Sequence, residues 1–258
     1  MFLNSKDFLD RITIEHGPRD LLTRYFLATA EAAASRDIHF DFGTFDELME
    51  VNQANSDSWS PITTTFRPCL GGASEDNGIV IFGRRPSGQV VSCQAARLYD
   101  WQNSNFKTEA EALRLFYAEP EAAKELGESC DVPSTEAEKL SGRISYCGGL
   151  WIHPSARGNG ALQLVSTLAR VTSYAFWGSD YITTLSTPPN MKKDFAKRNG
   201  FYFNPTSPVI MRNSPSLPGA DLNMTLLYKT PDQMMQYVFT MTQNLAAQVD
   251  RAVEERRA

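Results

Sequence analysis

The chain has 258 residues, of which 42% are hydrophobic and 21% charged, a composition typical of a globular protein with a sizeable core. Its 25 basic and 30 acidic side chains give a net charge of −5, so we expect no nucleic-acid partner. No run of 18 apolar residues is present and the first residues carry charges throughout, so we expect no membrane span, no secretory signal and a cytoplasmic location.

The cysteines and histidines do not form a metal-binding pattern. Cys69, Cys93, Cys130 and Cys147 contain no C-x-x-C pair, and the three histidines are scattered along the chain. We therefore expect no metal site, and we expect free thiols, as in a reducing compartment.

The N-terminal part of the chain is predicted to alternate between helices and strands. Residues 19–36 are rich in Ala and Leu without Gly or Pro, which favours a helix, and the apolar alternation that follows favours a strand. The elements expected up to Trp101 are a helix at 19–36, a strand at 38–42, a helix at 45–55, a long connection at 56–77, and a hairpin with strands at 78–85 and 89–101.

The second half begins with a polar segment rich in Glu and Ala, residues 107–140, which we expect to form one or two surface helices between core strands. The remaining expected elements are a strand at 143–152, a helix at 161–177, a strand at 180–187, a helix at 190–198, strands at 209–212 and 222–229, and a long helix at 231–257. The last helix has an apolar stripe of Met234, Val238, Met241 and Leu245, which indicates a core face or the contact face of a possible homodimer.

The segment from Leu150 to Val171 carries the clearest chemical signal. A strand ends at Pro154, a short loop runs through Arg157, Gly158, Asn159 and Gly160, and a helix begins. Glycines let the loop backbone approach a ligand closely, and the unpaired amides of a helix N-terminus attract phosphate groups. The helix opens with Ala161-Leu162 in place of Lys-Ser/Thr, which excludes a P-loop, and Gln163 replaces the third glycine of a dinucleotide fingerprint.

Two motifs in this region resemble those of the GNAT N-acyltransferases. The run from Leu150 to Gly160 is similar to the family's central motif, an apolar strand, a proline and R/Q-x-x-G-x-G/A before a helix. The second signature follows at the expected distance, as a strand at 181–187, Asn190, a short helix and Gly200-Phe201. The strong match covers about residues 143–203, and a weaker match of element order covers 38–230.

The resemblance implies an α+β fold with a central, mostly antiparallel twisted sheet that splays between strands 4 and 5 and is flanked by helices. Within this arrangement, we expect an N-terminal helical extension at 1–37, a GNAT-like domain at 38–230 with a helical insertion at 107–141, and a C-terminal helix at 231–258. The glycines Gly148 and Gly149 are expected to mark the bulge that opens the strands.

The resemblance also implies a site for acetyl-CoA or another acyl-CoA in the gap between the two splayed strands. The pantetheine would pair with the backbone of Leu150, Trp151 and Ile152, and Asn190 would approach the thioester. The pyrophosphate would contact the backbone amides of Arg157, Gly158, Asn159, Gly160, Ala161 and Leu162.

The sequence departs from the family pattern where catalysis is concerned. Leu162 stands where the motif has Gly or Ala, Ala196 replaces the tyrosine that protonates the leaving thiolate in many relatives, and a frequent Glu on the strand is absent. The catalytic residues are therefore open. Candidates are Tyr146 and Tyr202 as acids and Asp100 as a base, whereas Cys147 is expected to be packed rather than covalent.

We expect transfer of an acetyl group from acetyl-CoA to an amine of a small molecule or peptide by direct attack. Three alternatives stay open at this point: a non-catalytic acyl-CoA-binding or regulatory domain, a signal synthase that uses acyl-carrier protein, and a protein that only forms contacts with partners.

Overall fold

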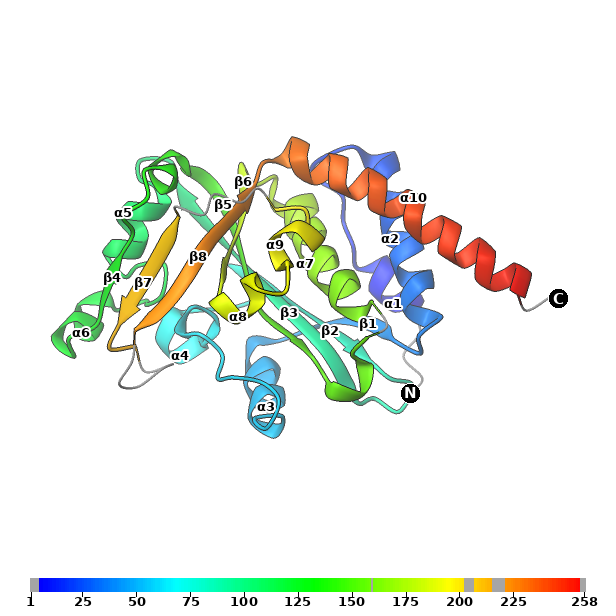
Figure 1. Cartoon of the computed structure of the whole chain (residues 1–258), viewed down its shortest axis with the longest axis horizontal. Coiled ribbons are helices and arrows are strands. Elements are labelled where there is room, and N and C mark those ends of the chain that lie inside the picture. The colour runs from blue at the N-terminus through cyan, green and yellow to red at the C-terminus, as the bar shows by residue number, and fades with distance from the viewer. Residues whose placement is uncertain (1–4, 159, 202–206, 215–220, 256–258) are drawn as a thin grey trace.

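The computed structural model describes residues 5–158, 160–201, 207–214 and 221–255, and these residues form a sheet with helices on both faces (Figure 1). The strands are β1 (His39–Gly43), β2 (Gly78–Arg84), β3 (Val90–Trp101), β4 (Ser129–Asp131), β5 (Gly142–Ile152), β6 (Tyr181–Ser186), β7 (Pro208–Arg212) and β8 (Leu222–Lys229). Their order in the sheet is β1-β2-β3-β5-β6-β8-β7-β4. Neighbouring strands are antiparallel except β5 and β6, which are parallel. The predicted mostly antiparallel α+β architecture is confirmed.

One face of the sheet is covered by α2 (Arg19–Ala34) and α7 (Ala161–Trp177), and α1 (Ser5–Asp10) lies beside β1. The apolar spacing of α7 explains this packing, because residues three and four apart lie on one side of a helix. The side chains on that side, Leu164, Val165, Leu168, Val171 and Ala175, are all at most 2% exposed. Together with alternate residues of the strands they form one of the two main apolar clusters.

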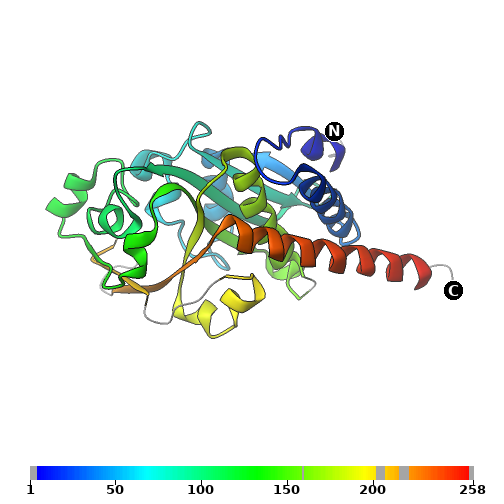
Figure 2. The same ribbon diagram turned by 90° about the horizontal axis from the view of Figure 1, so that it is seen from above.

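The helix α10 (Pro231–Glu255) lies along α2 on the same face and extends beyond it at its C-terminal end (Figure 2). Met234, Val238 and Leu245 are 1%, 0% and 4% exposed, respectively. The predicted apolar stripe is therefore a core face of this protein. Homodimer formation stays a prediction.

The opposite face is covered by α3 (Phe45–Ala54), the 3-10 turn η1 (Thr64–Phe66) and α4 (Pro68–Gly71), so the long connection predicted at 56–77 contains two short helical turns. The hydroxyl oxygen of Thr44 caps α3 by accepting from the amide of Glu47 at 3.1 Å. Phe45 and Phe66, each 1% exposed, pack against the strands from this side.

The segment at 107–140 forms two short helices, as predicted, and also a strand and a buried stretch that were not predicted. It contains α5 (Phe106–Glu111), α6 (Pro120–Glu125), the 3-10 turn η2 (Glu136–Lys139) and also β4, which pairs with β7 at the sheet edge. Phe106, Leu113, Leu115 and Phe116 are at most 3% exposed and belong to the core of the second face. Leu113, Leu115 and Phe116 lie between the two helices, and their burial was not predicted because a few apolar residues in a polar segment give no clear periodic pattern.

The predicted helix at 190–198 is two short helices, α8 (Pro188–Met191) and α9 (Phe195–Arg198). The chain breaks between them at Asp194, whose φ of 55° lies in the left-handed region that Asp tolerates better than most residues. The predicted helix end is confirmed, because Asn199 caps α9 and Gly200 has a φ of 62°.

Within the described part of the chain, no helix combines the length and the apolar character needed to cross a membrane.

Candidate acyl-CoA and acceptor site

The parallel strands β5 and β6 separate after a short paired stretch. They pair from Ile144 with Tyr181 to Tyr146 with Thr183. Beyond this point β5 continues to Ile152 while β6 stays with β8 as far as the pair Ser186 with Thr225. The C-terminal half of β5 therefore has a backbone edge that is not paired with β6, and backbone groups of this kind can bind an extended ligand.

A β-bulge lies at the start of this free edge. Cys93 pairs with Trp151 and Ala95 with Gly148, so Gly149 and Leu150 of β5 lie opposite a single residue of β3. Gly149 has a φ of 62°, which explains the need for glycine at the bulge. The predicted bulge at Gly148-Gly149 is confirmed.

The loop between β5 and α7 presents its backbone outward. It contains the 3-10 turn η3 (Pro154–Ala156), and Gly158 and Gly160 have φ values of 86° and 84°. A Cβ atom at Gly158 would meet nothing within 4 Å, so the surface in front of the loop is open. The amides of Gln163 and Leu164 already donate to the carbonyl oxygen of Gly160, at 3.1 and 3.3 Å. The start of α7 therefore has the conformation and the dipole that favour a phosphate group.

Arg157 is fixed at the end of β5. Its Nε donates to the carbonyl oxygen of Ile152 at 3.0 Å, and its Nη2 to that of Ser58 at 3.4 Å. The side chain of Trp151 stacks on Trp59 with ring centroids 4.9 Å apart, and its Nε1 donates to Ser58 Oγ at 3.2 Å. The loop before η1 is thus tied to the end of the free strand edge.

An open hollow of about 920 Å³ lies beside this junction. It is bordered by the C-terminal turns of α3, the loop at 56–61, Arg67, Pro154 and Arg157. The hollow therefore connects the predicted phosphate loop with the face of the sheet that carries η1 and α4.

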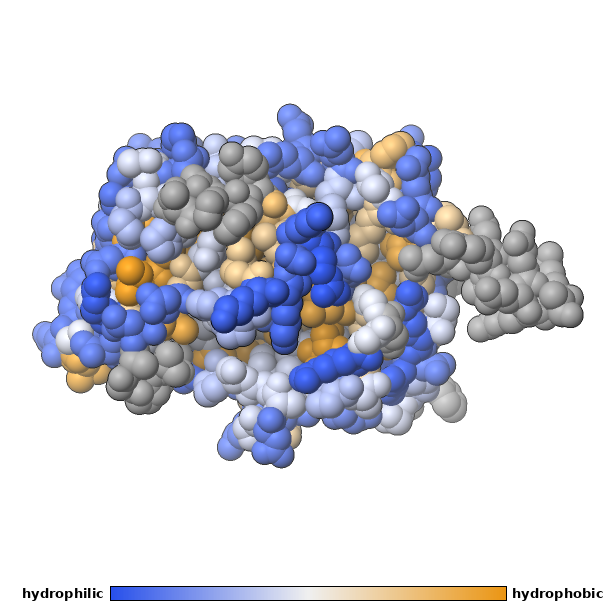
Figure 3. Space-filling model, in the orientation of Figure 1, coloured by the Kyte–Doolittle hydropathy of each residue, from blue (hydrophilic) through white to orange (hydrophobic). Residues whose placement is uncertain are grey.

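Helix α9 and the turn before it supply positive charge on the other side of the gap. Gln163 of α7 donates to the carbonyl oxygen of Arg198 at 2.9 Å, which places the end of α9 against the first turn of α7. Four basic side chains of this segment are exposed: Lys192, Lys193, Lys197 and Arg198. In Figure 3 hydrophilic side chains lie over the position of α9, and an apolar area opens below them toward the β5–α7 loop. A basic rim over an apolar floor suits a ligand that joins phosphates to an apolar arm.

The structure brings most of the predicted cofactor-binding residues to this gap. Leu150, Trp151 and Ile152 lie on the free half of β5, and Arg157, Gly158, Gly160, Ala161 and Leu162 follow in the loop and the first turn of α7. Asn190 is exposed on α8, directly after β6. Leu162 is half-buried and packs with the α7 face of the core. Two predicted residues, Asn159 and Tyr202, lie outside the described part of the chain.

The catalytic candidates Tyr146 and Asp100 are placed less favourably. Tyr146 is 4% exposed and stacks on Phe66 at 5.7 Å, and burial raises its pKa well above the usual range, so it does not act alone as an acid at neutral pH. Asp100 is exposed and pairs in register with Arg143, at the opposite end of β5 from the bulge. The structure does not bring Asp100 to the gap.

Two further positions bear on catalysis. Ala196, the position of the usual tyrosine, is 5% exposed and packs against Phe201 and Leu227. Cys147 is fully buried opposite Ala96 on the α7 face, and burial raises the pKa of its thiol to about 12. A thiol with so little thiolate at neutral pH does not act as a nucleophile, in agreement with its predicted packing role.

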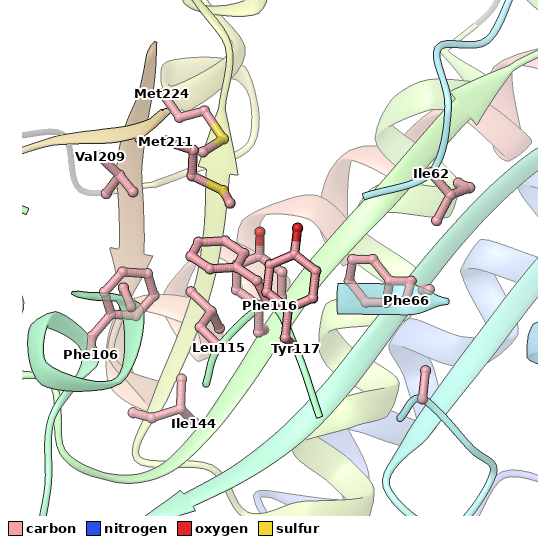
Figure 4. Packing of buried hydrophobic residues seen from close by; sticks show 14 of the residues in the cluster. Ile62, Phe66, Phe106, Leu115, Phe116, Tyr117, Ile144, Val209, Met211 and Met224 are labelled. Carbon is pink, nitrogen blue, oxygen red and sulfur yellow. The ribbon is translucent and has the colours of Figure 1, made fainter. Parts of the chain in front are cut away.

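Sequence reasoning missed a polar pair in the insertion. The Tyr117 hydroxyl donates a hydrogen bond to Oε2 of Glu128, and both side chains are 7% exposed. Figure 4 shows Tyr117 beside Phe116, between Met211 and Met224 on one side and Phe66 and Ile62 on the other. No spacing in the sequence relates Tyr117 to Glu128, because the pair depends on how the insertion folds back on itself.

No protein-family model matches the sequence, and no curated protein matches it either. Among solved structures, a GNAT family N-acetyltransferase from Escherichia coli in complex with CoA has 11% identity and a TM-score of 0.43, over 77% of this chain and 84% of that one. The ribosomal-protein-S5-alanine acetyltransferase from Vibrio fischeri has 9% identity and a TM-score of 0.45, over 76% of this chain and 94% of its own. An acetyltransferase of the GNAT family from Staphylococcus aureus has 11% identity and a TM-score of 0.40, over 74% and 98%.

These similarities are similarities of backbone fold alone. The chain itself has the features that the sequence motifs predict, namely a mostly antiparallel sheet, two strands that separate at a bulge, and a glycine loop that leads into a helix between them. The fold is therefore the mostly antiparallel α+β sheet with two separating strands that the sequence motifs predicted.

Proposed function

We propose that the protein is an acyl-CoA-dependent N-acyltransferase that transfers acetyl from acetyl-CoA to an amine of a small molecule or peptide by direct attack. The observation that carries this proposal is the free edge of β5 between the bulge at Gly149 and the outward-facing loop at Gly158. Along this stretch, the backbone N–H and C=O groups of β5 can hydrogen-bond to an amide-containing arm. The amides of the first turn of α7, which follow directly, can bind phosphates.

Each part of the stretch has a distinct role in this proposal. The edge at Leu150, Trp151 and Ile152 holds the pantetheine arm, and the loop and first turn of α7 hold the pyrophosphate. The basic side chains of α9 and of the turn before it face the remaining negative charge. When bound, acetyl-CoA supplies the activated acyl group. A backbone amide near the bulge polarises the carbonyl that the amine attacks, as an oxyanion-hole donor does.

The test is thiol release from acetyl-CoA by the purified protein, with a panel of phenethylamine, spermidine, lysine and a peptide with a free N-terminus. We expect at least one amine to raise thiol release above the amine-free rate, with a turnover on the order of 1 s⁻¹, at the low end of the usual range for enzymes. Detection of the acetylated amine by mass spectrometry confirms the transfer. Thiol release that no amine accelerates would contradict acyl transfer to amines.

One observation favours a second function, that of a non-catalytic acyl-CoA-binding domain. Ala196 is buried and has no hydroxyl at the position where many relatives have a tyrosine. A domain of this kind would bind acetyl-CoA with the affinity of an enzyme for its substrate, but no member of the amine panel would accelerate thiol release.

A further inference from the structure

In the described part of the chain, the buried carboxylate of Glu128 forms no ion pair. The Tyr117 hydroxyl is its hydrogen-bond donor. Glu109 of the same insertion is equally buried, at 7% exposure, but Arg114 binds its two oxygens at 2.7 and 2.8 Å. Burial of a carboxylate without a cation costs stability, so packing alone does not account for Glu128.

The segment that carries Tyr117 is held in place on both sides. The carbonyl oxygen of Leu115 accepts from the hydroxyl of Tyr99 on β3 at 2.7 Å, and the amide of Ala118 donates to the carbonyl oxygen of Leu70 on α4 at 2.9 Å. Leu113, at the turn before this segment, has a φ of 65°, which is uncommon for a bulky side chain. Strain of this kind is found where the surrounding structure fixes a functional residue.

Tyr117 belongs to the side-chain layer over the bulge. A Cβ atom at Gly148 would lie 2.4 Å from Phe66, and one at Gly149 would lie 3.6 Å from Ile62, so these two side chains cover the bulge directly. Figure 4 shows the hydroxyl end of Tyr117 directed away from Ile144, next to Phe66 and below Met211. The hydroxyl therefore lies on the face of the sheet opposite α7, and its hydrogen bond with Thr64 of η1 places it near Phe66, which covers the bulge.

We propose that Glu128 is the general base of the acyl transfer and that Tyr117 relays the proton to it, an inference that rests on the proposed function. The amine nitrogen forms its bond to the thioester carbonyl carbon, and its surplus proton passes to Tyr117 Oη as Tyr117 gives its own proton to Glu128 Oε2. The carbon–sulfur bond then breaks with its electron pair on sulfur. Glu128 returns the proton through Tyr117 to the thiolate, so both residues end as they began.

The environment of Tyr117 suits a relay. Burial and the hydrogen bond to Glu128 raise the pKa of the Tyr117 hydroxyl well above its usual range, and the hydrogen bond with Thr64 and then the positive charge of Arg67 oppose this shift. The hydroxyl therefore stays protonated at neutral pH and can give a proton only as it receives another. Phe116 and Met211, apolar side chains of the same cluster, are each 3% exposed.

The test compares Glu128→Gln and Tyr117→Phe with wild type and with Glu111→Gln, which removes an exposed carboxylate of the same insertion. For the amine that the wild type acetylates, we expect kcat/KM to fall about 100-fold in Glu128→Gln and in Tyr117→Phe, the usual contribution of a general base. Glu111→Gln should behave as wild type. The pH profile of kcat/KM should be less steep on the acid side in Glu128→Gln, because one ionisation is lost.

Calorimetric titration with acetyl-CoA and thermal unfolding of each variant separate this role from a structural one. We expect Tyr117→Phe to unfold at a lower temperature than wild type, because Glu128 loses its hydrogen-bond donor, but to be folded at the assay temperature and to bind acetyl-CoA as wild type does while kcat falls. If both variants bind acetyl-CoA and keep the wild-type kcat/KM and pH profile, the relay is wrong although the proposed function stands. If the wild type binds acetyl-CoA but acetylates no amine, the proposed function fails and the relay fails with it.

Discussion

Two buried cations meet at Asn199, where α9 ends. Lys229 Nζ donates to the carbonyl oxygen of Asn199 at 2.8 Å, and Arg170 Nη2 donates to its Oδ1 at 3.1 Å, with both cations 1% exposed. Burial, and then the charge of Arg170, lower the pKa of Lys229 well below its usual value. The rings of Phe201 and Tyr237, at 4.7 and 4.6 Å from Nζ, offset part of this effect because aromatic faces attract cations.

At the residue scale, we predict that Lys229→Met is more stable than wild type at pH 7. A lysine whose pKa is lower in the folded than in the unfolded state lends stability that is present above the unfolded pKa of 10.5 and is lost as the pH falls toward the folded pKa. The gain at pH 7 should be about 1–4 kcal/mol, as for other replacements of buried charges by apolar side chains.

Urea unfolding of both proteins at pH 7 and near pH 10.5 measures this difference in the free energy of unfolding. The other titratable groups are the same in both proteins, so their effects cancel when the variant is compared with wild type at each pH. The advantage of the variant should shrink at the higher pH. A variant that is less stable than wild type at pH 7, or an advantage that does not change with pH, would show that Lys229 is accommodated as a cation.

At the scale of elements, α10 stabilises the helical face of the sheet through its apolar stripe. Met234 is 1% exposed, whereas Phe239, five residues later on the same helix, is 51% exposed. We predict that Met234→Ala lowers the free energy of unfolding by about 2–5 kcal/mol, because it leaves a cavity in the core. Phe239→Ala should change it by no more than about 0.5 kcal/mol.

Chemical denaturation of the two variants measures both values. Equal effects of the two substitutions would contradict the assignment of the stripe as core, and a concentration-dependent loss of stability in Phe239→Ala would point to the predicted homodimer.

Local patterns account for the elements that the sequence predicted well. The spacing of Leu164, Val165 and Leu168 determines the buried side of α7, and Gly158 and Gly160 adopt the left-handed conformations that a phosphate loop requires. These features depend on a few neighbouring residues, so they can be read from the sequence alone.

Contacts between distant segments account for what the sequence did not predict. The strand β4 forms because β7 offers it an edge, and the helix at 190–198 breaks at Asp194 without a glycine or proline. Tyr117 and Glu128 meet only after the insertion has folded. A polar segment with scattered apolar residues does not show in advance which of its side chains enter the core.

At the scale of the whole molecule, the sheet is covered on both faces, and the separation of β5 and β6 exposes a strand edge within it. The net charge of −5 does not describe this region, because four exposed basic side chains lie beside it, two in the turn between α8 and α9 and two on α9. Local charge and a free strand edge, rather than overall composition, support the proposed acyl-CoA site.

Calorimetric titration with acetyl-CoA tests the central claim, an acyl-CoA site at the free edge of β5 and the loop before α7. We predict a dissociation constant in the micromolar range, about that of typical enzyme substrates, for the wild type. Gly158→Asp, which places a carboxylate at the predicted phosphate site, should weaken binding at least about tenfold, equivalent to about 1.4 kcal/mol. Gly127→Asp is the matched control, because Gly127 also has a positive φ, of 82°, and lies in the insertion, away from the loop. No binding by the wild type, or equal binding by the two variants, would contradict the account.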